Sequence, residues 1–107
     1  MPYVLEEDKV FNVDTFDETL IEDVVGVYDT EEEVMDELAQ LIDMWETELE
    51  AKGFVILDKR EYGIDYCAPE KLEEMEKEGV YEGYHRISFG IRYVSEEEAE
   101  SVRRQLL

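Results

Sequence analysis

One helical stripe of apolar residues constrains the fold of this chain more than any other feature. Between residues 29 and 53 apolar side chains recur at the spacing that places them on one face of an α-helix. These residues are Val34, Leu38, Leu41, Ile42, Trp45 and Leu49. Thr30 and Glu33 form a capping box that begins a helix, and Gly53 suits the left-handed conformation that ends one. The spacing predicts a long amphipathic helix with one buried face.

The same segment is unusually acidic, with ten carboxylates and one cation, Lys52. At about 100° per residue, five acids project opposite the apolar stripe and form a ridge roughly 27 Å long. We call these residues the acidic ridge: Glu32, Asp36, Asp43, Glu46 and Glu50. No lysine lies among them to form neutralising pairs along the helix, so we expect the ridge to remain unneutralised and to meet a partner. A solvated helix face without a partner is the alternative.

The second half of the chain alternates between strand and helix patterns. Residues 54–68 and 84–94 are rich in β-branched and aromatic residues, and a bulge or a tight turn is expected to split the first of these segments into two strands. Between them, Pro69 begins a short helix that ends at Gly79. Ser95 and Glu98 form a second capping box, which predicts a C-terminal helix.

The first 28 residues are ambiguous. "KVFNV" favours a strand, whereas "TFDETLIEDVVG" favours a helix begun by Thr15 and Glu18, with a strand over "DVVGVY" as the alternative. No linker divides the chain, so residues 1–107 are expected to form one domain. The summed pattern predicts an α+β fold, with a small antiparallel sheet of three to four strands and helices packed on one face.

Net charge limits the classes of partner. The chain has 31 acids and 10 bases, a formal charge of −21, which repels nucleic acid and membrane surfaces and attracts basic proteins. Salt adaptation is an alternative origin of the acidity, although glutamates outnumber aspartates by 22 to 9 and five lysines remain. One cysteine, the lack of a leader pattern and the lack of a long apolar run favour a cytoplasmic, intracellular protein.

Residues suited to catalysis are few. His85 is the only histidine and is interpreted as a surface or hairpin residue, and Cys67 as a small packed hydrophobe. Tyr84, Arg86 and Arg92 share a predicted strand that offers a weak small-anion site, unless each arginine pairs with a neighbouring acid. We therefore expect no enzyme activity, no catalytic residue, no bound metal and no cofactor.

A metal-dependent hydrolase is the enzymatic alternative. Glu32, Glu33 and Asp36 are similar to the E-E-x-x-E helix signature of the nucleotide pyrophosphohydrolases typified by MazG. That family is all-helical and needs a second acidic motif on a packed neighbouring helix. Strand patterns fill most of the second half of this chain, so the signature is incomplete here.

Size, charge, an acidic long helix beside short strands and the lack of a catalytic constellation together resemble one class of proteins. These are the small acidic inhibitors of phages and mobile elements, of the anti-restriction and anti-CRISPR type, which mimic DNA and occupy the basic groove of nucleases or other nucleic-acid enzymes. The resemblance implies a partner with a basic surface and no direct contact with nucleic acid; the oligomeric state is left open. The predicted partner-binding residues are the acidic ridge together with Glu73 and Glu74. An acidic adaptor module that binds through an apolar patch is the alternative function.

Overall fold

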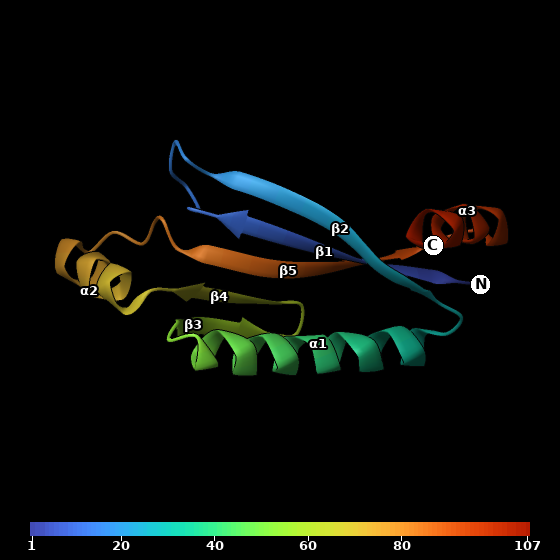
Figure 1. Cartoon of the computed structure of the whole chain (residues 1–107), viewed down its shortest axis with the longest axis horizontal. Helices are drawn as coiled ribbons and strands as arrows, with labels where there is room; N and C mark the ends of the chain where they lie inside the picture. Colours follow the sequence, from blue (N-terminus) through green and yellow to red (C-terminus); the bar gives the residue numbers. More distant parts are fainter.

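The computed structural model describes all 107 residues as a five-stranded antiparallel sheet with three helices (Figure 1). Its elements are β1 (Tyr3–Phe11), β2 (Thr19–Tyr28), α1 (Glu31–Ala51), β3 (Val55–Arg60), β4 (Gly63–Cys67), α2 (Pro69–Glu78), β5 (His85–Tyr93) and α3 (Glu96–Leu106). The strand order is β2-β1-β5-β4-β3, so β2 and β3 are the two edges. The predicted α+β class is confirmed, and the predicted three to four strands are too few.

The long helix α1 forms as the apolar spacing predicted. The Glu33 backbone N–H donates to the Thr30 hydroxyl at 3.1 Å, which caps the first turn, and Gly53 follows the helix with a φ of +90°. The stripe packs on strands β1, β4 and β5 to form the main core. The buried residues of this core, from the helix and the strands together, are Leu5, Val34, Leu38, Ile42, Leu49, Ile64, Tyr66, Ile87 and Phe89.

The two faces of the sheet are covered by different helices, which corrects the prediction that all helices lie on one face. Leu5 packs against α1, whereas its neighbour Val4 packs against Ala99 and Val102 of α3. Because successive side chains of a strand point to opposite faces, α1 and α3 lie on opposite sides of the sheet. α3 covers only one end of its side of the sheet.

The second strand occupies residues that were predicted as a helix, and that prediction is wrong. The Glu18 backbone N–H does bond to the Thr15 carbonyl at 3.2 Å, but Asn12 and Asp14 have positive φ and the segment closes a turn. Residues 19–28 then pair along the whole of β1. The β-branched residues of this segment gain more from a strand partner than from helical spacing. The strand alternative over "DVVGVY" is therefore confirmed, but the strand begins earlier, at Thr19.

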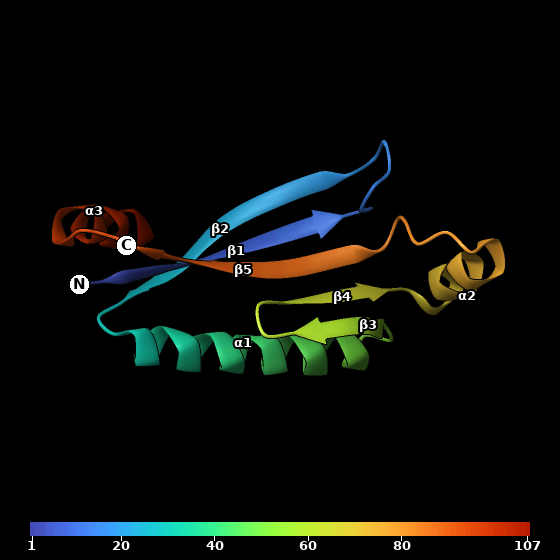
Figure 2. The same cartoon turned by 180° about the vertical axis from the view of Figure 1, so that it is seen from behind.

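The second half of the chain follows its predicted order. One break was expected, as a bulge or a tight turn, and both alternatives occur. A turn at Glu61 and Tyr62 separates β3 from β4, and the register shifts between Ile56 and Asp58. The molecule is elongated, 51 × 27 × 22 Å, with α2 and α3 at opposite ends (Figure 2). None of the three helices combines the length and hydropathy of a membrane span.

Trp45 joins α1 to β1 through a polar contact at the margin of the core. Its indole N–H donates to the Glu7 carboxylate at 3.1 Å, and the Lys9 ammonium lies 4.9 Å from the centre of its ring. Lys9 also lies 3.5 Å from the Glu7 carboxylate. Glu7 is one of two buried charged residues of the chain, and these two partners compensate its burial.

Candidate functional site

The acidic ridge lies on the outer side of α1, as predicted. Glu32, Asp36, Asp43 and Glu50 are exposed and Glu46 is half-buried, while the apolar stripe of the same helix faces the sheet. Because the opposite face of α1 is held by buried contacts, the ridge carboxylates are mounted on a fixed backbone. The predicted exposure is therefore confirmed for four of the five ridge residues, and Glu46 is the exception.

The charge of the ridge differs from the prediction in its C-terminal half. Lys59 of β3 reaches the Asp43 carboxylate at 3.0 Å and the Glu46 carboxylate at 3.1 Å. The bulge between Ile56 and Asp58 places Lys59 opposite Ile64, on the side of the sheet that carries α1. The expectation of an unneutralised ridge is therefore wrong at Asp43 and Glu46, because the neutralising cation comes from a strand and not from the helix.

The N-terminal half of α1 carries a dense run of acids without an ion-pair partner. The run comprises Glu31, Glu32, Glu33, Asp36 and Glu37. The helix dipole favours the three acids of the first turn but not Asp36 and Glu37, which lie beyond it. Burial raises the pKa of the neighbouring Tyr28, and the charge of Glu37 raises it further. The negative field of this half is therefore largely uncompensated.

The two predicted contact residues of α2 do not extend the ridge. Helix α2 lies at the far end of the long axis from the N-terminal half of α1 (Figure 1). Glu74 lies 3.6 Å from Lys71, whereas Glu73 has no ion pair. The predicted partner-binding residues thus form two separate acidic regions, one on α1 and one on α2.

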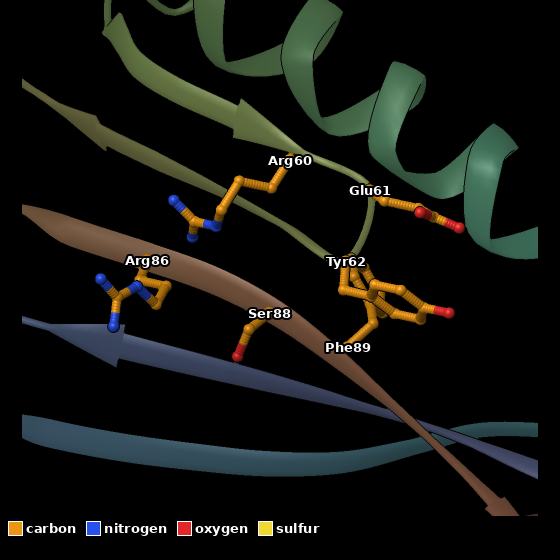
Figure 3. Close-up of a pocket in the computed structure, with 6 residues that line it drawn as sticks. All are labelled: Arg60, Glu61, Tyr62, Arg86, Ser88 and Phe89. Carbon is orange, nitrogen blue, oxygen red and sulfur yellow. The ribbon is translucent and has the colours of Figure 1, made fainter.

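The arginines of the sheet gather on its open side. We define the open sheet face as the residues opposite α1 that α3 leaves uncovered: Asp8, Arg60, Asp65, Arg86 and Ser88. Asp65 is only 8% exposed, and it accepts hydrogen bonds from Arg60 at 2.9 and 3.0 Å and from Arg86 at 2.8 Å. A shallow depression beside them is lined by both arginines and Ser88 (Figure 3). The sequence reading did not single out Asp65, because its partners lie on neighbouring strands.

The charges of this cluster are balanced, so it does not form an anion site. Arg60 also contacts Asp58 at 2.8 Å, which gives two acids for the two arginines. Burial raises the pKa of Asp65, but the hydrogen bonds from Arg60 and Arg86 outweigh burial and hold that pKa below its usual value. Arg92 likewise contacts Glu6 and Glu98. The expectation that each arginine of β5 pairs with a neighbouring acid is confirmed.

His85 and Cys67, the two residues considered for catalysis, have the surroundings of residues that support the fold. The His85 ring packs between Phe11 and Tyr66, and its Nδ1 accepts the Asn12 backbone N–H at 3.2 Å. Burial lowers the pKa of His85, which favours the neutral ring that this acceptor role requires. Cys67 is fully buried, as expected of a packed residue, and burial raises the pKa of its thiol.

The geometry that a metal-dependent hydrolase needs is not present. Glu32, Glu33 and Asp36 lie on a helix that packs against the sheet and not against a second acidic helix. No three His, Cys, Asp or Glu side chains of the chain converge on a point where they could hold a metal ion.

Comparison with known proteins finds no matching family model, no similar curated protein and no similar solved structure.

Proposed function

We propose that the protein is a non-enzymatic acidic inhibitor that occupies the basic groove of a nucleic-acid-binding enzyme, such as a restriction or CRISPR nuclease. The observation that carries the proposal is the large excess of acids that the fold leaves without cations. The ion pairs involve eleven acids and leave the other twenty of the 31 without a partner. A protein needs a net charge of only about 2 to 8 in magnitude for solubility.

The linear density of charge supports mimicry of a nucleic acid. Dividing the 51 Å length by the net charge of 21 gives one net negative charge for every 2.4 Å of the long axis. Duplex DNA carries one for about every 1.7 Å of its axis. A basic groove that binds duplex DNA would therefore encounter a similar density of negative charge along this protein.

The N-terminal half of α1 is the contact surface that this proposal favours. Its acids need no rearrangement to meet Arg or Lys, because the apolar stripe fixes the helix and no internal ion pair has to break. Asp43 and Glu46 would first have to give up Lys59, which weakens their contribution. We therefore assign the main contact to Glu32, Asp36 and Glu37, and a smaller one to Glu50, Glu73 and Glu74.

The test compares two sets of three acids on the same helix. The N-terminal set, Glu32→Gln with Asp36→Asn and Glu37→Gln, removes acids without ion pairs. The C-terminal set, Asp43→Asn with Glu46→Gln and Glu48→Gln, removes the same charge from acids that Lys59 and Lys52 already contact. The tagged protein is used to capture enzymes from a lysate at low and high salt. Displacement of a fluorescent duplex from each captured enzyme is then measured by anisotropy.

We expect the protein to compete with the duplex for the captured enzyme, and this competition should weaken steeply as salt is added. The N-terminal set should weaken the competition on the order of tenfold to a hundredfold, and the C-terminal set by much less. Equal effects of the two sets would reject the N-terminal half of α1 as the contact surface. Capture of a partner that binds the duplex and this protein at the same time would reject mimicry itself.

An adaptor module is the second candidate, and exposed apolar residues favour it. Phe16 at the tip of the β1–β2 turn is fully exposed, and Val80 and Tyr81 before β5 are about half exposed. An adaptor would bind through such residues with little dependence on salt. Capture that persists at high salt and is lost on Phe16→Ser, with both acid sets unaffected, would favour this function over inhibition.

A further inference from the structure

No helix covers the first half of β2. Its residues Thr19 to Asp23 are all exposed, whereas the second half of the strand is half-buried by α1 and α3. As the outermost strand, β2 pairs only with β1, so its outer edge presents backbone donors and acceptors to solvent. In Figure 1 this end of the β1–β2 hairpin lies apart from the three helices.

The two faces of this half-strand carry the same combination of side-chain types. Residues 20–23 read Leu-Ile-Glu-Asp, and successive side chains of a strand point to opposite faces. Leu20 and Glu22 therefore lie on one face, and Ile21 and Asp23 on the other. Leu20 is 55% exposed and Ile21 is 49% exposed, and neither acid has an ion-pair partner. Each face thus offers one apolar and one anionic side chain to a strand placed alongside.

We propose that the free edge of β2 binds an extended cationic segment of a partner protein as a sixth strand of the sheet. A fitting segment has two adjacent apolar residues followed or preceded by two adjacent Lys or Arg residues, so that each face pairs apolar with apolar and cation with acid. A second copy of this chain fits poorly. Its β2 would bring Glu22 and Asp23 toward like charges, and each copy carries −21.

This inference is independent of the proposed inhibition, because the edge lies outside the acidic ridge and the probes below contain no nucleic-acid enzyme. The matched probe is the peptide Val-Lys-Lys-Val-Val-Lys-Lys-Val, which places valine and lysine alternately on each face. The first control has the same composition in strict alternation, which puts every valine on one face and every lysine on the other. The second control is the matched probe with its two central valines replaced by proline, which keeps the charge and removes strand pairing.

Binding of the end-capped peptides is measured by calorimetry at several salt concentrations. The matched probe should bind roughly fivefold or more tightly than either control. Glu22→Lys with Asp23→Lys should abolish that preference, whereas Glu73→Lys with Glu76→Lys on α2 should keep it at the same net charge. Circular dichroism checks that both variants fold. Amide hydrogen exchange should show new protection confined to residues 19–23.

Equal binding of the three peptides would mean general attraction to an acidic protein and would overturn the proposal. Protection that appears on α1 or α2 in place of β2 would also overturn it. A concentration-dependent dimer that the Glu22→Lys and Asp23→Lys variant dissociates would assign the edge to a second copy and would equally contradict a cationic partner segment.

Discussion

The open sheet face and the N-terminal half of α1 hold their acids in opposite ways. Asp65 is buried and contacts two arginines, whereas Asp36 is exposed and contacts no cation. On the open sheet face, Asp65 of β4 forms ion pairs with arginines of both neighbouring strands, so this acid contributes to the fold. In the N-terminal half of α1 the acids repel one another, and beyond the first turn neither the helix dipole nor a cation compensates Asp36 and Glu37. The acids of this half of α1 are therefore held at a cost in stability and are free to contact a partner.

Replacing Asp65 should have the largest effect on stability. Asp65→Asn leaves Arg60 and Arg86 without their shared carboxylate, and removing one partner of a buried pair costs about 3 to 5 kcal/mol. Both arginines are more than one third exposed, so we expect a smaller loss of about 2 to 3 kcal/mol in urea denaturation. Asp58→Asn, at an exposed partner of Arg60, is the control and should cost less than about 1 kcal/mol. Equal losses would contradict the distinction between the two regions.

The contribution of Asp65 should depend on pH in a defined direction. Its pKa is lowered in the folded protein, and an unfolded aspartate titrates near about 3.9. The stabilisation is therefore fully present above about pH 4 and is lost as the pH falls through the lower folded pKa. The difference in unfolding free energy between wild type and Asp65→Asn should stay constant from neutral pH to about pH 5 and narrow below about pH 4. A difference that grows on acidification would contradict the assigned role of Asp65.

The N-terminal acid set of α1 should raise stability, whereas the C-terminal set should not. The N-terminal set removes repulsion that no cation offsets, so its thermal unfolding midpoint should rise, with a gain of about 0.5 to 1 kcal/mol. The C-terminal set removes contacts to Lys59 and Lys52 and should be neutral or destabilising by up to about 1 kcal/mol. Differential scanning calorimetry of both variants measures the contrast. Two gains of equal size would show that Lys59 does not compensate Asp43 and Glu46.

Lys59→Met should give the smallest effect. It leaves Asp43 and Glu46 without their shared cation while retaining most of the apolar length of the side chain. For such an exposed pair the cost should be about 0.5 kcal/mol at low salt and should disappear at high salt, because salt screens surface charges. The loss is measured by urea denaturation at the two salt concentrations. A loss that salt does not reduce would point to packing by the Lys59 stem and not to charge.

The features that local sequence determines were predictable, and those that distant segments determine were not. The capped helix α1, the caps at Ser95 and Gly79 and the break between β3 and β4 all follow from residues close together in the chain. Residues 19–28 became a strand because β1 lies beside them, and helical spacing contains no information about that neighbour. The Lys59 contacts depend on the register shift near Ile56, and the Asp65 cluster depends on the pairing of three strands. In the candidate site, the position of the acids could be predicted, but not the cations that the fold brings to them.

The contact between Trp45 and Glu7 allows the packing of α1 on the sheet to be followed by tryptophan fluorescence. Trp45 is the only tryptophan of the chain, and its indole touches a carboxylate and an ammonium group that both belong to β1. Detachment of the helix would expose the ring to water and release both charged neighbours at once. The intrinsic fluorescence of the unlabelled protein therefore reports on this one joint between helix and sheet.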